Sequence, residues 1–241
     1  MTAPADAPAY DPSGPSRPAG TRAVRPRNAA TLILVRRDLG EPRLLMGRRS
    51  GGHDFMPDKW VFPGGRVDRC DFDAPAATEL APEVAARLAA TAPAKGAHTL
   101  PRALAMAAVR ETFEEAGLLL AQPSAPRPAI GGWRAFLEAG AAPDLAALDF
   151  VARAITPPSR PKRFDARFFM AEATALLSLE RRADTGELGE IDWFSFDEVE
   201  ALDLPNVTRF VVREIAQRLA EPGRPVLSLS ARHGKRHLAM L

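Results

Sequence analysis

The stretch that decides the fold is Arg110-Glu111-Thr112-Phe113-Glu114-Glu115-Ala116-Gly117-Leu118, which ends an alanine-rich helical pattern running from Ala103 to Ala116. Glu111, Glu114 and Glu115 are spaced i, i+3 and i+4, so three carboxylates share one helix face. Like charges this close destabilise an isolated helix. Either Arg110 steadies a solvated acidic face through Glu114 at i, i+4, or the carboxylates bind a hard divalent cation. Gly117 predicts a left-handed helix end.

A second informative stretch lies upstream and reads Trp60-Val61-Phe62-Pro63-Gly64-Gly65-Arg66-Val67-Asp68-Arg69-Cys70-Asp71. Together the two stretches resemble the Nudix box, Gly-x5-Glu-x7-Arg-Glu-U-x-Glu-Glu-x-Gly-U, in which U is apolar. Gly65 matches the first glycine, and Asp71 stands where the box has Glu. The segment from Arg110 to Leu118 matches the second half, except that Thr112 replaces an apolar residue.

The box is interrupted in this chain. Gly65 and Arg110 are 45 positions apart, whereas the family spacing is 14, so about 31 residues are inserted between the halves. A branch of the family similar to the peroxisomal coenzyme A diphosphatases also has an insertion inside its box. The segment from Thr156 to Phe169, which contains Thr156-Pro157-Pro158 and Arg163-Phe164-Asp165, is similar to a stretch of the same branch.

The resemblance implies the fold class, an α/β protein with a Nudix-type α/β/α sandwich around a mixed sheet. It implies a cofactor as well, Mg²⁺ or Mn²⁺, with Glu111, Glu114 and Glu115 as metal ligands and a backbone carbonyl at Gly65 as a further contact. Glu111 and Glu115 are the leading ligands, and Arg110 orients the carboxylates. The general base is either Glu111 or an acidic residue before the Trp193 strand, where Glu190 and Glu187 are the candidates. Taken singly, each of those two could equally be a solvated loop carboxylate.

Candidate substrate-binding residues are basic or lie in the glycine turn. Arg48 and Arg49 end a strand, either as solvated charges or as contacts to phosphate, whose geometry a guanidinium matches. Gly64 lets the backbone approach a ligand closely. Arg160 and Arg163, with Lys162 between them, form a basic cluster that serves either solubility or the steering of an anionic substrate.

The element pattern predicts one domain with two extensions. Residues 1–27 are rich in Pro, Ala and Gly and predict a disordered tail. Residues 28–221 predict the Nudix domain, with a helical insertion at about 72–101 that either covers the active-site mouth or packs on the surface. Residues 222–241 predict a basic tail, either an anion-binding arm or disordered.

Within the domain, strands are expected at 30–35, 43–48, 60–62, 164–171, 173–179 and 191–194, from apolar runs or alternation. Helices are expected at 77–90, 132–140 and 206–219, with a further one starting at Phe196. The catalytic helix is expected to begin with Thr99 as N-cap and Pro101 in its first turn. Leu104, Ala108 and Val109 are expected to supply its apolar face.

Composition narrows the class of protein. The 241 residues carry a net charge of +2 and 46% hydrophobic residues, which is ordinary for a globular protein and gives no indication of nucleic-acid binding. The single cysteine, Cys70, fits a reducing compartment. No apolar run is long enough to cross a membrane, and neither end carries a recognisable targeting signal. We therefore expect a cytoplasmic protein; the resemblance is compatible with a homodimer.

The expected reaction is hydrolysis of a diphosphate in a small-molecule substrate. The split box and the segment from Thr156 to Phe169 favour coenzyme A or acyl-coenzyme A, cut to 4′-phosphopantetheine and adenosine 3′,5′-bisphosphate. The alternative enzyme substrates are ADP-ribose, NADH and nucleotide sugars. A different class is a non-catalytic Nudix-like binding or regulatory domain, which usually has broken box carboxylates, whereas all three helix carboxylates are present here.

Overall fold

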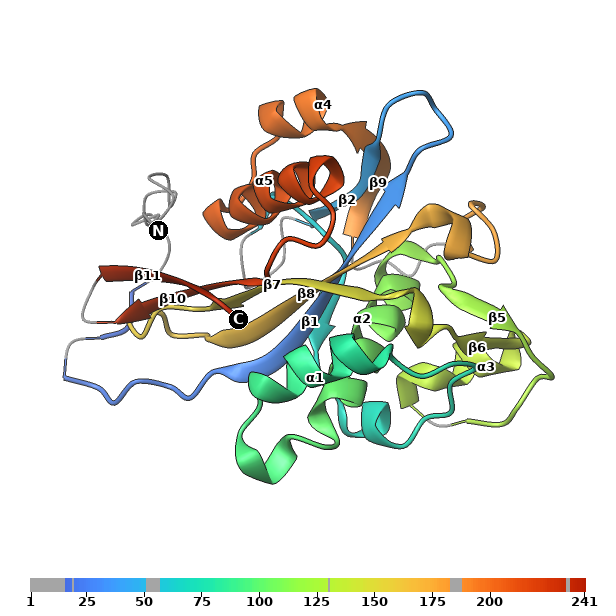
Figure 1. Cartoon of the computed structure of the whole chain (residues 1–241), viewed down its shortest axis with the longest axis horizontal. Helices are drawn as coiled ribbons and strands as arrows, with labels where there is room; N and C mark the ends of the chain where they lie inside the picture. The colour runs from blue at the N-terminus through green and yellow to red at the C-terminus, as the bar shows by residue number, and fades with distance from the viewer. Residues whose placement is uncertain (1–15, 19, 51–56, 130, 183–187, 233–234) are drawn as a thin grey trace.

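A mixed β-sheet lies between two layers of helices, which confirms the α/β/α sandwich predicted from the sequence (Figure 1). The computed structural model describes residues 16–18, 20–50, 57–129, 131–182, 188–232 and 235–241. Within these ranges the large sheet has nine strands, which are β1 (Arg27–Arg36), β2 (Arg43–Arg49), β3 (Trp60–Val61), β4 (Gly64–Arg66), β7 (Asp149–Ile155), β8 (Phe164–Glu172), β9 (Leu188–Ser195), β10 (Leu227–Arg232) and β11 (Lys235–Met240). Strands β5 (Ala121–Pro123) and β6 (Ala141–Pro143) form a separate small sheet.

The order along the large sheet is β11-β10-β7-β8-β1-β2-β3, with β4 paired to β1 and β9 paired to β2. The β1–β8 and β7–β10 pairs are parallel, and the other pairs are antiparallel. Strand β1 lies near the centre because an apolar, β-branched run can be buried on both faces. Leu32 and Leu34 face one hydrophobic core, and Ile33 and Val35 face the other.

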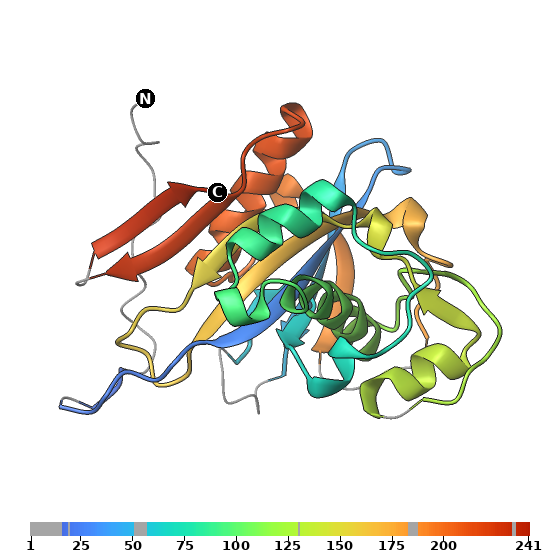
Figure 2. The same cartoon turned by 60° about the horizontal axis from the view of Figure 1, so that its bottom comes forward.

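Helices cover both faces of the sheet. On one side lie α1 (Pro82–Ala90) and α2 (Leu100–Ala116), with the short α3 (Arg134–Glu138) beyond α2; on the other lie α4 (Phe196–Ala201) and α5 (Asn206–Ala220) (Figures 1 and 2). Five 3₁₀ helices connect the described elements: η1 (Arg69–Phe72), η2 (Ala94–Gly96), η3 (Gly131–Trp133), η4 (Leu145–Ala147) and η5 (Ala173–Ala175). The expected amphipathic helix near the C-terminus is confirmed as α5.

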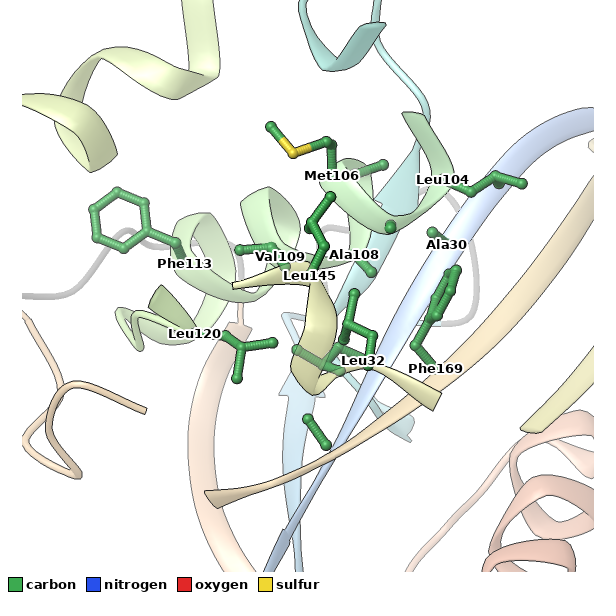
Figure 3. Close-up of a cluster of buried hydrophobic side chains, with 14 of the residues drawn as sticks. Ala30, Leu32, Leu104, Met106, Ala108, Val109, Phe113, Leu120, Leu145 and Phe169 are labelled. Carbon is green, nitrogen blue, oxygen red and sulfur yellow. The ribbon is translucent and has the colours of Figure 1, made fainter. Parts of the chain in front are cut away.

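Helix α2 is buried on almost all sides from Leu100 to Val109. The buried surface is therefore much wider than the apolar face of three residues that we expected from the sequence. Figure 3 shows Met106, Ala108 and Val109 lying among side chains of the sheet and of the surrounding loops. Its alanines have little side-chain volume, so the helix can pack closely against the sheet. Thr99 is the N-cap residue and Pro101 lies in the first turn, as predicted, although the Thr99 side chain forms no capping hydrogen bond.

One expected strand, residues 173–179, does not form. Residues 173–175 are η5, and Leu176 makes only an isolated bridge with Leu120. The ladder of β8 with β1 ends at the pair Val35 and Glu172, so the chain beyond has no neighbouring strand to continue it. The apolar run from residue 173 does not specify geometry by itself. Strand β7 was not expected, although it pairs with β8 over most of its length.

The two ends of the chain differ from the expected tails where they are described. Strands β10 and β11 form a hairpin, and β10 extends the sheet beside β7, so residues 227–232 and 235–240 are not a disordered tail. At the other end, Arg17 N–H donates to the Ser159 carbonyl (2.7 Å), and Arg163 donates to the Val24 carbonyl (2.7 Å). Residues 1–15 of the expected tail lie outside the described residues.

The insertion belongs to the core rather than to a detached surface element. Val84 and Leu88 of α1 are buried in the cluster that contains α2. Before α1, the Thr78 hydroxyl bonds the Asp144 carboxylate, and Ala77 N–H donates to the Pro143 carbonyl (2.8 Å). These contacts tie the insertion to the sheet side that carries α2.

In the part of the chain described, no helix combines the length and apolar character needed to cross a membrane.

Candidate active site

Two carboxylates of α2 face the glycine turn that holds β4. The Gly64 N–H donates to Glu115 Oε2 at 2.7 Å. At Gly65 an added Cβ would overlap the Glu111 carboxylate, so only a residue without a side chain fits there. Residues 64–66 are held by antiparallel pairing with Ala29, Ala30 and Thr31 of β1. The turn is therefore fixed on the central strand, with Glu111 and Glu115 one helical turn apart against it.

Arg110 joins the two sequence stretches across the insertion. Its Nε donates to Asp71 Oδ1 (2.8 Å) and its Nη2 donates to Asp71 Oδ2 (3.0 Å). The same Nη2 donates to the carbonyl of Arg66 (2.9 Å), and Nη1 donates to Glu114 (2.7 Å) and pairs with Glu111 (2.9 Å). The residues inserted in the sequence thus leave the two halves in direct contact.

The charge of Arg110 is held by its surroundings. Burial disfavours a charged guanidinium, and only 6% of its side chain is exposed. Against that burial, the hydrogen bonds to Asp71 and the negative charges of Glu111, Asp71 and Glu114 raise the pKa of Arg110 above its ordinary value. Arg110 is therefore a permanent cation that fixes three carboxylates around it.

Asp71 belongs to the site, although we did not predict it as a site residue from the sequence. Its side chain is fully buried, and besides Arg110 it accepts from Trp133 Nε1 (3.0 Å) and from the Asp68 backbone N–H (2.7 Å). Asp68 in turn caps η1, which presents Asp71 to the helix. The signal was available, because Asp71 stands six residues after Gly65 at the acidic position of the box.

Glu114 lies differently from the other two helix carboxylates. One of its oxygens accepts from Arg110, and an added Cβ at Gly132 would overlap the other, so Glu114 faces the segment that leads into Trp133. About a third of its side chain is exposed, against 12% for Glu111. Glu115 therefore faces the glycine turn, Glu114 faces the Arg110 side, and Glu111 contacts both.

The residues at the glycine turn fit a divalent cation in their chemistry. Carboxylate and backbone carbonyl oxygens are the ligands that hard divalent cations prefer. A turn in which glycine has no side chain also lets the backbone come close to a bound ion. Across the described ranges, no group of three or more His, Cys, Asp and Glu side chains is placed to hold a metal ion. Mg²⁺ does not require such a group, since it is often held by one or two carboxylates together with water and substrate phosphates.

The strand-end candidates lie on β2 and β9. Arg48 pairs with Glu190 (Nη1 to Oε1, 3.0 Å), and the two residues are also partners in the antiparallel ladder. Both side chains are well exposed. Arg49 follows a register shift in the same ladder. Glu187, the other acidic candidate, lies outside the described residues. The Glu190 carboxylate is thus compensated by a candidate substrate-binding arginine.

The basic cluster at 160–163 lies in the loop between β7 and β8. Arg163 donates to the carbonyls of Thr156 (2.9 Å) and Val24 (2.7 Å), which secures the loop and the N-terminal segment. Burial, with a contribution from Arg17, lowers the pKa of Arg163. Arg160 N–H donates to the Pro157 carbonyl within the same loop. Arg163 therefore has a clear structural role, beside the substrate contact expected of it.

Comparisons with known proteins find a matching family model and a similar protein. The family model described as the NUDT19 Nudix domain matches residues 26–204. The acyl-coenzyme A diphosphatase NUDT19 of Gallus gallus is 33% identical over 178 residues, which cover 53% of this chain and 47% of that protein. The alignment thus spans about half the length of that relative.

A solved structure shares the fold. The NUDIX hydrolase from Alicyclobacillus acidocaldarius has a TM-score of 0.57 and 28% sequence identity, and the match covers 80% of this chain and 92% of that one.

Proposed function

The chain belongs to the Nudix hydrolase family, and from that premise we propose that it is a metal-dependent diphosphatase acting on coenzyme A or acyl-coenzyme A. The observation that carries the catalytic part is the packing of Glu111 and Glu115 against the Gly64-Gly65 turn. The substrate part is supported by the likeness to a protein named as an acyl-coenzyme A diphosphatase. That likeness spans only part of either protein, so the substrate stays a proposal.

The proposed roles follow from the contacts. Glu111 and Glu115 would hold Mg²⁺ or Mn²⁺ at the glycine turn. When bound, such a cation neutralises charge on the diphosphate and makes an attacking water more acidic. Arg110 is a positioning residue, since its donors are directed to Asp71, Glu111, Glu114 and a backbone carbonyl. It holds Glu111 in place without needing to contact substrate.

Proton removal from the attacking water needs a carboxylate near the substrate. Glu111 is placed at the glycine turn, whereas Glu190 lies on β9 in an ion pair with Arg48. We propose that Glu111 acts with Glu115 as a metal ligand and that Glu190 is the candidate base. Glu190 would be released from Arg48 when Arg48 or Arg49 contacts the substrate diphosphate. Arg160 and Arg163 are proposed to steer the anionic substrate toward the site.

The test is a substrate panel with Mg²⁺ or Mn²⁺, in which products are resolved by chromatography. The panel holds coenzyme A, acetyl-coenzyme A, ADP-ribose, NADH and nucleotide sugars. We expect release of adenosine 3′,5′-bisphosphate from the coenzyme A members. Turnover of ADP-ribose or NADH alone would contradict the substrate and leave the metal site standing. No turnover at all would favour a non-catalytic binding domain.

A matched variant tests the metal assignment. Glu115→Gln keeps the shape of the side chain and an oxygen for the Gly64 N–H, but it removes the charge. We expect turnover to fall about a hundredfold or more, because charge stabilisation by a metal contributes several kcal/mol to the transition state. Unchanged turnover at saturating Mg²⁺ would show that Glu115 is not a ligand.

A further inference from the structure

A cavity lined by arginine lies beside the glycine turn and is used by none of the roles above. Its volume is about 540 Å³, and its walls include Arg25, Arg27, Arg66 and Arg153, with Thr91 from the end of the insertion and Asp165 from β8. Small-molecule sites commonly enclose about 300–1,000 Å³. The cavity is therefore large enough for part of a nucleotide.

The single negative charge of Asp165 does not balance the two arginines that contact it. Arg153 donates to both of its oxygens (2.8 Å each), and Arg167 Nη1 lies 3.0 Å from Oδ1. One carboxylate is thus shared by two guanidinium groups, of which Arg153 lines the cavity, and this leaves one positive charge in excess beside the cavity.

Among the described residues, Asp165 is the one charged group that pairs with Arg167. Arg167 is fully buried, and its donors also reach neutral acceptors: Thr91 (carbonyl at 3.1 Å, hydroxyl at 3.2 and 3.3 Å), the Asn28 side chain (3.0 Å) and the Asp165 backbone carbonyl (2.9 Å). Burial lowers the pKa of Arg167 to about 10, with Asp165 opposing that shift, so the group is still charged at neutral pH. An anion in the cavity would relieve this uncompensated positive charge.

Three further arginines add to the positive charge at the opening. Arg25, Arg27 and Arg66 are exposed, and within the described part of the chain none of them has an ion pair or a side-chain hydrogen bond. The described cavity walls thus include four arginines and one carboxylate, Asp165, which the buried Arg167 also contacts. Guanidinium groups bind phosphate through paired hydrogen bonds, so this composition selects a phosphate rather than an apolar group.

The cavity also lies next to the proposed reaction centre. Arg66 directly follows Gly65, and in the β1–β4 ladder it is opposite Ala29, next to Asn28. If the diphosphate of a nucleotide binds at the glycine turn, the nucleoside attached to it is therefore long enough to extend into the cavity. A second phosphate on the same nucleoside would fall among the arginines.

We propose that this cavity binds a phosphomonoester dianion attached to the nucleoside of the substrate, which in coenzyme A is the phosphate on ribose O3′. The inference rests on the proposed diphosphatase function, and it adds a site that separates coenzyme A from nucleotides lacking that phosphate. The insertion contributes Thr91, so part of the selectivity comes from residues placed between the two halves of the box.

The test compares coenzyme A with dephospho-coenzyme A, which lacks the 3′-phosphate. For the wild type we expect a lower KM for coenzyme A. The double variant Arg25→Gln/Arg27→Gln should raise KM for coenzyme A at least about tenfold more than KM for dephospho-coenzyme A, since a hydrogen bond to a charged group contributes about 1.5–3 kcal/mol. Equal KM values for the two substrates in the wild type would overturn the proposal while leaving the diphosphatase function intact.

A matched control is Arg213→Gln. Arg213 is an exposed arginine of α5, the helix that packs on the opposite face of the sheet, and it has no ion pair in the described part of the chain. We expect it to leave the ratio of the two KM values unchanged. A matching change in that ratio would show that general surface charge, rather than the cavity, discriminates the substrates.

A binding measurement separates this proposal from the diphosphatase function. Calorimetry without added metal would compare adenosine 3′,5′-bisphosphate with adenosine 5′-monophosphate on the wild type and on the double variant. Tighter binding of the bisphosphate, lost in the variant, supports the cavity even if no substrate of the panel is turned over. Equal binding of the two nucleotides overturns it.

The last experiment uses inorganic phosphate, because a free phosphate ion presents the same charged oxygens to the cavity as the phosphomonoester does. If it competes with adenosine 3′,5′-bisphosphate on the wild type, both ligands use the cavity, as proposed. If it binds the wild type but not the double variant, and leaves bisphosphate binding unaffected, the cavity is a site for the free anion and the proposal is wrong.

Discussion

At the scale of single residues, Asp71 connects the separated halves of the box. Its carboxylate is fully buried and accepts hydrogen bonds from Arg110, Trp133 and the Asp68 backbone. Removing one partner of a buried ion pair leaves the other charge uncompensated and costs about 3–5 kcal/mol. We therefore expect the contact to affect both the stability of the fold and the orientation of the proposed catalytic carboxylates.

We expect Asp71→Asn to destabilise the fold by about 3 kcal/mol, because the amide directs N–H groups at the Arg110 guanidinium. The measurement is urea unfolding, with turnover of the folded fraction as a second readout. Asp73→Asn is the matched control: Asp73 is exposed two residues away, so its effect should stay within about 0.5 kcal/mol. Equal losses in both variants would contradict the role assigned to Asp71.

Gly65 makes a different contribution, which concerns position rather than charge. In Gly65→Ala the new methyl group would overlap the Glu111 carboxylate and force it to move. We expect turnover to fall about a hundredfold, since small displacements of catalytic groups have effects of that size. Gly96→Ala meets its nearest neighbour only at 3.8 Å and should keep wild-type turnover. Wild-type turnover in Gly65→Ala would remove Glu111 from the proposed site.

At the scale of elements, the end of α2 contacts Arg181 and Arg182, the last described residues before β9. Gly117 has φ of 69°, and its N–H donates to the Phe113 carbonyl. Arg182 N–H then donates to the Gly117 carbonyl (3.1 Å), and the Arg181 side chain donates to the Ala116 carbonyl (3.0 Å). Cationic donors at a helix C-terminus satisfy its free carbonyls and its dipole. The C-terminal end of α2 and residues 181–182 are therefore joined by hydrogen bonds.

Gly117→Ala should be more destabilising than backbone strain alone. The left-handed conformation costs a residue with a side chain about 1 kcal/mol, and here the added Cβ would also lie 2.6 Å from the Arg182 carbonyl oxygen. Gly223→Ala isolates the strain, because Gly223 has φ of 86° and nothing within 4 Å of an added Cβ. In thermal unfolding we expect the Gly117 variant to lose clearly more stability. Equal losses would mean that the contact with Arg182 yields easily.

At the scale of the whole molecule, the sequence was enough to predict the layered α/β/α architecture and most of the elements whose hydrophobic pattern is strongly periodic. The buried run in β1 and the amphipathic α5 follow local patterns, and both were predicted. Strand β7 and the hairpin of β10 with β11 were not, because each depends on a neighbour distant in the sequence. The residue contacts of Asp71 and the arginine cavity also join segments far apart in the chain, which spacing alone does not reveal.

A buried charge network joins α5 to the sheet edge where that hairpin is attached. Arg218 lies 3.6 Å from both Glu214 and Asp149, and it donates to the Pro225 carbonyl (3.1 Å) just before β10. Arg224 also approaches Glu214 (3.4 Å). Burial raises the pKa of Glu214, and its two arginine neighbours oppose that shift without cancelling it. The folded protein therefore binds a proton at Glu214 more tightly than the unfolded chain does.

The sign of the pH dependence follows from that difference. Between the ordinary value of 4.5 and the raised value in the folded state, the folded state holds the proton and the unfolded state does not, so lowering the pH through this window stabilises the fold. Glu214→Gln cannot titrate and lacks this gain. We expect the free energy of unfolding of the wild type to increase relative to Glu214→Gln as the pH falls from neutral to about 4.5, measured by urea titration at each pH. A difference that is constant, or that changes in the opposite direction, would show that the arginines dominate over burial and hold Glu214 ionised where α5 meets the hairpin.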